Sequence, residues 1–343
     1  MRDLMLSGPG RIVGTTLAVL VLTGAFFLAI GRDPAELMGR IVRSAVGDGY
    51  AITESLVRAT PILLCALATA LPARLGLITV GAEGQLYFGA LLGTGFVLAN
   101  LGATGAAPYM AMIVVAMLAG AAWALLPAVL RSHLGVNETI STLLVNYVAA
   151  LLVTWVVYGP WKSAANLGWP ATADFPGAFK PGTFFDSRVH SGLWIAIGLA
   201  VLLHWTFVRT RWGLTLDVLR SNPRAGVAAG LNWRRNVLVT MALGGMLAGL
   251  AGILETASIQ GRLQANLSAG AGLSGFLVAW LARNHCLRII PMSLLVGALL
   301  ASGDGLQMFA NVPSSIALVV QGLLFVAVLL VGGFANRLQV RRG

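Results

Sequence analysis

Long runs of hydrophobic residues without a charge alternate with short polar segments along the chain. Because a helix needs about 20 apolar residues to cross a bilayer, such runs predict membrane-spanning helices. The 47-residue run is interrupted in its middle by a Gly- and Pro-containing stretch, so it predicts two spans. The charge-free runs are 12–31, 59–73, 84–130, 139–161, 189–208, 236–254, 263–282, 289–303 and 305–336. The pattern predicts an all-α integral membrane protein with about ten transmembrane helices, some of them short or broken. Nine spans are possible, because two of the runs have 15 residues.

Composition and charge agree with this reading. The 343 residues are 57% hydrophobic and 10% charged, whereas soluble domains contain about 25% charged residues. With the N-terminus in the cytoplasm, the cytoplasmic segments hold 15 basic and 4 acidic residues, and the outer segments hold 8 of each. The whole net charge of +11 then falls on one side, as the positive-inside rule requires. Both termini are therefore expected to be cytoplasmic.

The connections divide this single transmembrane domain, residues 1–343, into segments with different expected roles. Residues 32–58 mix charged and apolar positions, which predicts an amphipathic helix at the outer membrane surface. Residues 159–190 form an outer loop rich in Trp and Pro. Its tryptophans are either interface anchors or part of a docking surface for an external partner. Residues 209–235 form the longest cytoplasmic connection and hold six arginines.

Within that connection, residues 220–230 predict a short helix. Ser221 or Asn222 can cap its start, Pro223 suits its first turn and Gly230 suits its end. Its surface consists of small residues, so a groove on another protein can accept it with close backbone contact. The alternative is a charged loop that sets topology and has no partner.

Two further polar segments flank the spans. The glycines and the acid of residues 76–85 predict a broken helix whose backbone groups face a cavity rather than lipid. In residues 135–146, Asn137 is expected to cap a helix and Glu138 to favour its positive end. Asn146 then projects an amide into the span, where it either bonds a neighbouring helix or lines a pathway. The Gly-rich run 244–249 predicts close helix packing.

Several kinds of chemistry have no sequence support. The chain has no Gly-Lys-Ser/Thr sequence for a phosphate-binding Walker A loop. Its four histidines are scattered without metal-ligand spacing, and no nucleophile–base set is evident. We therefore expect neither an enzyme nor a metal site. The acids concentrate at span ends, which argues against an ion-coupled carrier without excluding one.

Four stretches resemble a known family. GLITVGAEGQ (76–85), GVNETISTLLVNY (135–147), NPRAGVAAGL (222–231) and GFLVAWLARNHCL (275–287) are similar to permease subunits of ATP-binding-cassette (ABC) importers. The similarity is to the nucleoside branch with basic-membrane-lipoprotein-type uptake systems, a branch related to the ribose and other sugar permeases and to the branched-chain amino-acid permeases. It spans roughly residues 55–335. Ile78 and Thr79 replace a Phe-Asn pair of the relatives, so any role of that Asn does not carry over.

The resemblance implies a permease subunit in the bacterial cytoplasmic (inner) membrane that imports nucleosides or related nucleobase compounds by alternating access. It implies an ABC ATPase that holds the ATP and Mg, with no cofactor in this chain. It also implies a second permease, a paralogue rather than a copy, and a periplasmic or lipid-anchored binding protein; no nucleic-acid polymer is involved. The residues expected to couple to the ATPase are Arg220, Ser221, Asn222, Pro223, Arg224, Ala225, Gly226, Ala228, Ala229 and Gly230.

Nucleosides are polar, planar and mostly neutral, so their pathway needs amides, hydroxyls and an aromatic face rather than fixed charge. The candidate pathway residues are Glu83, Gln85, Ser141, Asn146, Trp155, Gln260 and Asn266. Two alternatives stay open at this point. One is a simple-sugar permease on the same ABC scaffold, and the other is a self-sufficient secondary carrier.

Overall fold

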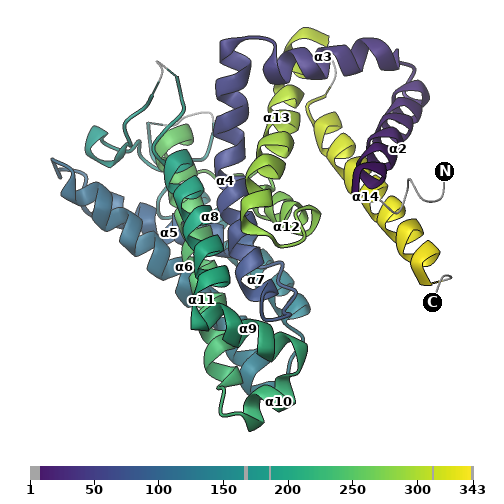
Figure 1. The fold of residues 1–343 in the computed structure, drawn as a ribbon. Coiled ribbons are helices and arrows are strands. Elements are labelled where there is room, and N and C mark those ends of the chain that lie inside the picture. The colour runs from purple at the N-terminus through teal and green to yellow at the C-terminus, as the bar shows by residue number, and fades with distance from the viewer. Residues whose placement is uncertain (1–7, 166–168, 185–186, 311–312, 341–343) are drawn as a thin grey trace. The chain divides into compact units, whose positions relative to one another are not determined.

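A computed structural model describes residues 8–165, 169–184, 187–310 and 313–340, with the backbone alone at 8–13, 308–310 and 332–340. These residues form helices and contain no β-strand beyond two isolated bridges (Figure 1). The predicted all-α class is confirmed. The principal helices are α2 (Gly8–Ala29), α3 (Pro34–Val46), α4 (Gly49–Ala73), α5 (Ala82–Ala99), α6 (Ala107–Leu134), α7 (Glu138–Tyr158), α8 (Gly192–Arg209), α9 (Arg211–Ser221), α10 (Pro223–Ala228), α11 (Trp233–Glu255), α12 (Ala271–Leu281), α13 (Cys286–Ala310) and α14 (Ser315–Val340).

Every predicted span overlaps a helix, but the helices differ in length. Six helical segments of the described chain are long and apolar enough to cross a membrane, and a bent pair raises the number to seven. In that pair, residues 14–29 of α2 meet α3 at an angle of 116°. By this measure α12 is a short apolar helix of 11 residues. Multiple spans are thus established, while the count of ten stays a prediction. The predicted cytoplasmic ends include residues 1–7 and 341–343, which lie outside the described residues.

The helices group into two compact units. The first unit comprises residues 1–58 and 295–343. Its core is a cluster of buried apolar side chains from α2, α3, α13 and α14, and the Arg58 guanidinium donates to Asp304 at 2.8 Å. The clustered side chains are Phe27, Leu37, Leu306, Ile316 and Val320.

Helix α3 begins and ends within the segment 32–58 predicted to lie at the outer membrane surface. Asp33 caps its start by accepting from the backbone N–H of Ala35 at 2.8 Å, and Pro34 occupies the first turn. Asp48 then accepts from Ala51 at 2.7 Å at the start of α4, so residues from Gly49 onward belong to the next helix. The position of α3 at a membrane surface stays a prediction.

The second unit comprises residues 59–294, and glycines bring three of its helices into backbone contact. A side-chain carbon added at Gly120 of α6 would collide with the carbonyl oxygen of Gly245 in α11, and the reverse also holds. Gly89 of α5 lies against the backbone of Gly249 in the same way. Small residues allow such approach between membrane helices. The close packing predicted for residues 244–249 is therefore confirmed.

The outer segment 159–190 folds onto this unit rather than extending from it. Phe175 and Phe179 are buried in a cluster with apolar side chains of α5, α6 and α11. The backbone N–H of Phe175 donates to the carbonyl of Gly261 at 2.7 Å, and that of Thr172 donates to Leu263 at 3.1 Å. Residues 166–168 and 185–186 of the predicted loop lie outside the described residues.

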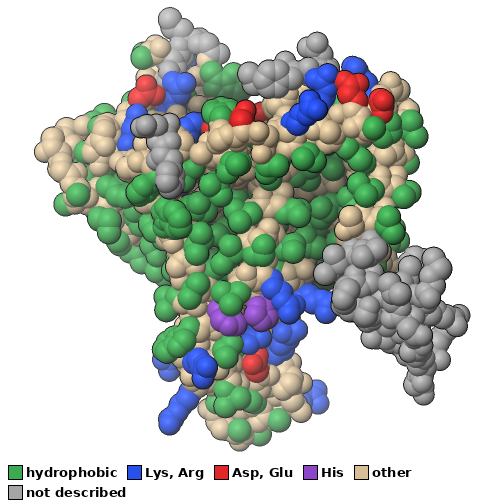
Figure 2. Space-filling model, turned by 45° about the horizontal axis from the view of Figure 1, so that its top comes forward, with side chains coloured by type: hydrophobic (Ala, Val, Ile, Leu, Met, Phe, Trp, Pro, Cys, Tyr) green, Lys and Arg blue, Asp and Glu red, His purple; other side chains and the backbone are tan. Residues whose placement is uncertain are grey.

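The surface between the polar ends of the helices is apolar. Among its exposed side chains are Leu144, Leu151, Val201, Leu202 and Trp205. Figure 2 shows hydrophobic side chains covering a broad zone of one face, with charged side chains gathered beyond its borders. An apolar patch of this extent is expected where lipid, rather than water, meets the protein.

Candidate functional site

The second unit contains a short non-helical linker, residues 77–80, between α4 and α5. Leu77 and Thr79 are almost fully buried. The backbone groups of a buried non-helical stretch must find hydrogen-bond partners inside the protein. In this structure the partners are side chains of the first turns of α7, about 60 residues further along the chain. The helix break predicted for residues 76–85 is confirmed. The backbone groups of Ile78 and Val80, which were expected to face a cavity, are instead bonded by side chains of α7.

The start of α7 is fixed by its own sequence. Gly135 adopts the left-handed conformation (φ 70°) that ends α6, and this conformation suits glycine. The side chain of Asn137 then accepts from the backbone N–H groups of Thr139 and Ile140, at 2.9 and 3.2 Å. The predicted capping role of Asn137 is confirmed. The cap leaves Glu138, the first residue of α7, pointing toward the linker.

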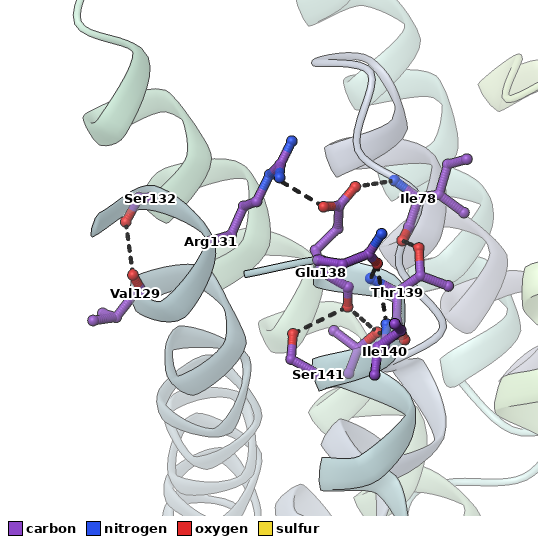
Figure 3. A network of polar contacts seen from close by, with 10 residues as sticks. Ile78, Val129, Arg131, Ser132, Glu138, Thr139, Ile140 and Ser141 are labelled. Carbon is purple, nitrogen blue, oxygen red and sulfur yellow. Dashed lines mark hydrogen bonds and ion pairs between the residues drawn. The ribbon is translucent and has the colours of Figure 1, made fainter. Parts of the chain in front are cut away.

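Glu138 joins three elements (Figure 3). One carboxylate oxygen accepts from the backbone N–H of Ile78 in the linker at 3.1 Å, and the other pairs with the Arg131 guanidinium of α6 at 3.1 Å. The Glu138 side chain is only 9% exposed. Next to it, the Thr139 hydroxyl donates to the carbonyl of Ile78 at 2.7 Å, so both backbone groups of Ile78 are bonded to α7. A buried carboxylate is tolerable because both of its oxygens have partners.

Further along α7, two more side chains form hydrogen bonds with the backbone of the linker and of the first turn of α5. The Thr142 hydroxyl accepts from the backbone N–H of Val80 at 3.2 Å. The amide of Asn146 donates to the Val80 carbonyl at 2.8 Å and accepts from the backbone N–H of Gly84 at 2.9 Å. Of the two roles left open for Asn146, the structure shows the bond to a neighbouring segment.

Glu83, in the first turn of α5, connects this region to α12. Its carboxylate accepts from the hydroxyl of Ser268 and from the backbone N–H of Leu273 at 3.1 Å. Helix α12 starts after Gly270, which has φ of 82°, and its own cap residue supplies no side-chain bond. Glu83 therefore supplies the side-chain cap that the start of α12 lacks.

Gln260 holds the same segment from the other side. Its amide nitrogen donates to the carbonyl of Leu267 at 2.8 Å, next to the Ser268 that binds Glu83. Its amide oxygen is buried without a hydrogen-bond partner. Among the candidate pathway residues, Gln260 is thus the one with an unused buried acceptor.

The structure brings some of the predicted pathway residues together and separates others. Gln85 is buried near Gly81, and the Ser141 hydroxyl donates to the Glu138 carbonyl of its own helix at 3.2 Å. Both lie in the region where α5 meets α7, with Glu83 and Asn146. Trp155, by contrast, is 66% exposed near the far end of α7, and Asn266 is exposed in the turn before α12.

A short helix also forms within the predicted segment 220–230, but Arg220 and Ser221 are the last two residues of α9 and not part of it. Helix α10 starts at Pro223, and the Asn222 side chain accepts from the backbone N–H of Ala225 at 3.1 Å. Gly230, with φ of 84°, ends it. Of the ten residues predicted to couple, only Gly226 is buried, where it faces Leu219 of α9.

Sequence reasoning missed two features near these segments. It assigned no role to Val227, an apolar side chain of α10 that is 54% exposed. It also did not anticipate that Thr139 and Thr142 bind the linker. Their hydroxyls recur at three-residue spacing beside Glu138, a pattern that places them on one side of a helix. Among the described residues, no three His, Cys, Asp or Glu side chains come together as a metal site requires.

Comparison with known proteins identifies relatives over most of the chain. The family model described as "Branched-chain amino acid transport system / permease component" matches residues 51–329. A glucose ABC transporter permease protein of Haloferax volcanii is 33% identical and covers 96% of this chain and 89% of its own. A guanosine ABC transporter permease protein of Bacillus subtilis is 27% identical, covering 92% and 90%. A nucleoside ABC transporter permease protein of Lactococcus lactis is 26% identical, covering 89% and 86%.

Proposed function

The chain belongs to the family of permease components of branched-chain amino acid transport systems, and from this premise we propose that it imports nucleosides or related nucleobase compounds. It is an ABC transporter permease and a multi-pass protein of the cytoplasmic membrane, a transport component rather than an enzyme. In the proposed mechanism the substrate crosses by alternating access, and ATP is hydrolysed with Mg on a separate ATPase. This chain needs no cofactor of its own.

The exposed helix α10 is the observation that carries the proposal. Both of its ends are capped by its own sequence, yet nine of the ten residues from Arg220 to Gly230 named above are exposed. A short helix with small side chains and an exposed apolar Val227 suits a groove on a partner protein. We assign that groove to the ATPase. Closure of two ATPase subunits would then draw two such helices together and rock the permease halves.

Two variants of α10 test this assignment. Arg224→Glu reverses a charge on the exposed surface, and Ala228→Trp blocks close approach without touching a buried residue. Both are expected to abolish uptake while the chain stays in the membrane at wild-type level. Arg211→Glu, the same charge reversal at an exposed residue of α9, is the control and should keep most uptake. Normal uptake by both α10 variants would contradict the coupling role.

The cargo is assigned from the relatives and from the kind of side chains available. The B. subtilis relative is described as a guanosine permease and the L. lactis relative as a nucleoside permease. Neutral polar substrates require hydrogen-bonding side chains rather than fixed charge. We propose Glu83, Gln85, Ser141, Asn146, Trp155, Gln260 and Asn266 as residues of the pathway. Gln260 leads this set, because its buried amide oxygen lacks a partner.

A variant of Gln260 tests the pathway. Gln260→Leu removes the amide but keeps similar volume, and we expect a higher KM for guanosine uptake with the same amount of protein in the membrane. Thr256→Ala is the matched control, because the Thr256 hydroxyl bonds the Gly252 carbonyl of its own helix at 2.8 Å. An unchanged KM in Gln260→Leu would remove this residue from the pathway.

A simple sugar is the second candidate cargo, and one observation favours it. The glucose permease of H. volcanii is 33% identical over nearly the whole chain, a higher identity than that of the nucleoside relatives. Competition between unlabelled and labelled substrates during uptake distinguishes the two candidate cargoes. Uptake of labelled guanosine that is blocked by excess adenosine but not by glucose or ribose would support nucleosides. Labelled glucose uptake that nucleosides do not block would replace our assignment.

The proposal also includes an assembly and a topology. We expect a paralogous second permease, an ATPase and a periplasmic or lipid-anchored binding protein that docks on the outer segment 159–190. We further propose ten spans, both termini in the cytoplasm and α3 at the outer membrane surface. Co-purification in mild detergent should recover an ATPase and a second permease. Ion-driven, ATP-independent transport by this chain alone in liposomes would instead identify a secondary carrier.

A further inference from the structure

A groove of about 570 Å³ lies between α9 and the first turns of α11. Its volume falls in the range of small-molecule binding sites, about 300–1,000 Å³. None of the proposed pathway residues and none of the linker residues lines it, and of the ten residues proposed to couple to the ATPase only Gly230 does. Its principal lining residues are Trp212, Thr215, Asn232, Arg235, Val239 and Leu243.

The groove is polar at one end and apolar along its length. Arg235 lies in the first turn of α11 and is exposed, while Val239 and Leu243 follow at intervals of four residues. Residues at this spacing share one face of a helix. At about 1.5 Å per residue, the apolar wall therefore extends roughly 6 to 12 Å beyond the arginine. A ligand that fills the whole groove needs a charged end and an apolar tail.

The polar end is suited to an anion. The side chain of Asn232 accepts from the backbone N–H of Arg235 at 2.9 Å and so fixes the start of α11. The positive end of the helix dipole then adds to the charge of the Arg235 guanidinium. The described residues provide no salt-bridge partner for Arg235. Arginine is also the side chain best matched to phosphate geometry.

Trp212 forms one wall of the groove and is held in place by α11. Its indole N–H donates to the side-chain oxygen of Asn236 on α11 at 3.1 Å, which ties α9 to α11. Tryptophan is enriched at membrane–water interfaces because its ring is apolar and its N–H is polar. The segment Trp233–Gln260 is one of the candidate membrane spans, so in the proposed topology the groove lies at the cytoplasmic end of a span.

We propose that this groove binds an anionic phospholipid from the adjacent leaflet. The phosphate group lies at Arg235, and an acyl chain follows Val239 and Leu243. Inorganic phosphate alone would use the polar end and leave the apolar wall uncovered, so the lipid is the better fit. The anionic character of the leaflet rests on the cytoplasmic placement of this end of α11 in the proposed topology. The site itself does not depend on which cargo is transported.

Native mass spectrometry of the complex purified from its membrane and delipidated provides the test. Phosphatidylglycerol, phosphatidylcholine and inorganic phosphate are titrated in turn. We expect saturable binding of phosphatidylglycerol, much weaker binding of phosphatidylcholine and no competition by phosphate at equal concentration. Arg235→Gln should weaken phosphatidylglycerol binding about tenfold or more, as expected for loss of a charge-assisted contact. Leu243→Trp should fill the apolar end and prevent binding.

Arg234→Gln is the matched control, because Arg234 is exposed next to Arg235 but does not line the groove. Equal binding by Arg234→Gln and Arg235→Gln would overturn the proposal in favour of general surface electrostatics. Competition by phosphate as effective as that by the lipid would identify a free-anion site instead. Wild-type binding that appears only after removal of the partner subunits would assign the groove to a protein interface. Because binding is measured directly, a failure of the nucleoside assignment leaves these outcomes unaffected.

Discussion

The linker at residues 77–80 and the helix α10 both lie between long helices, but they differ in where their polar groups find partners. In the linker, the backbone groups of Ile78 and Val80 are bonded by side chains of α7. In α10 the caps satisfy the helix ends, and almost every side chain faces outward. The hydrogen-bond partners of the linker lie within the chain, whereas the side chains of α10 remain exposed and available to another molecule.

This difference follows from the surroundings. The linker is buried by its neighbours, with Leu77 and Thr79 almost fully covered, so water cannot satisfy its backbone groups and the protein must do so. At a water-exposed end the solvent satisfies the same groups, and the sequence is free to shape a surface for another molecule. We therefore expect changes in the linker region to reduce stability, and changes in α10 to reduce transport while stability is kept.

The largest effect on stability is expected for Asn146→Leu. This change leaves the Val80 carbonyl and the Gly84 N–H buried without their partner. Each unsatisfied buried group costs about 1–3 kcal/mol, so the free energy of unfolding should fall by about 2–6 kcal/mol. Thermal unfolding in detergent measures the loss. Ser141→Ala, which removes a bond within α7, is the control and should change it by less than about 1 kcal/mol. Equal melting of both variants would mean that the linker bonds contribute little.

The outer segment should behave like the linker, and His190 makes this measurable through pH. Burial lowers the pKa of His190 to about 4, and its Nδ1 accepts from the backbone N–H of Gly192 at 3.1 Å. The unfolded chain binds a proton near pH 6.5, so the stability from neutral His190 is complete above that pH and is lost as the pH falls toward 4. The loss amounts to about 3 kcal/mol. His190→Asn, which keeps an acceptor but cannot titrate, should remove that part of the pH dependence. If the free energy of unfolding of the variant depends on pH as steeply as that of the wild type, His190 is not buried in the folded protein.

A Gly→Ala substitution adds the same methyl group near the linker and in α10, so its effect on stability can be compared between the two regions. In Gly84→Ala the new carbon would lie 2.7 Å from the Asn146 side-chain oxygen and 2.8 Å from its Cα, so α5 and α7 must separate. Such overpacking costs about 1–3 kcal/mol. In Gly226→Ala the new carbon meets the flexible end of Leu219 at 2.7 Å, and the gain in helix propensity is up to about 1 kcal/mol. Its melting temperature should stay level or rise slightly. A similar loss in both variants would remove the contrast between linker and α10.

The sequence predicted the parts of both regions that depend on neighbouring residues. Asn137, Asn222 and Gly230 cap or end helices as expected, because these signals act over three or four residues. The partners of the linker lie 60–66 residues away, and those of Glu83 lie 185–190 residues away. No local pattern carries that information. The sequence therefore predicted each of the polar segments 76–85 and 135–146, but not the hydrogen bonds between them.

The prediction of the number of spans from the sequence is limited for a different reason. A charge-free run measures how far a helix can continue without a charge, but it does not reveal where the backbone turns. Helix α12 ends at Leu281, and Arg283 and Asn284 both have positive φ, at 53° and 56°. Such a conformation is uncommon for residues other than glycine and depends on tertiary packing. The run 263–282 consequently contains 11 helical residues of α12 after an irregular stretch.

The smallest effect is expected for Asp217→Asn, in the same part of the chain as α10. Asp217 of α9 pairs with Arg74 at 3.6 Å, and the two side chains are 47% and 28% exposed. Exposed pairs of this kind contribute about 0–1 kcal/mol. Arg74 also keeps its position over the Phe207 ring, 5.3 Å from the centroid, after the carboxylate is neutralised. Unfolding in detergent at low and high salt should therefore give nearly the same midpoint for the variant and the wild type. A loss as large as that of Asn146→Leu would mean that the α9–α10 region is held by buried polar bonds as the linker is, and the contrast between them would fail.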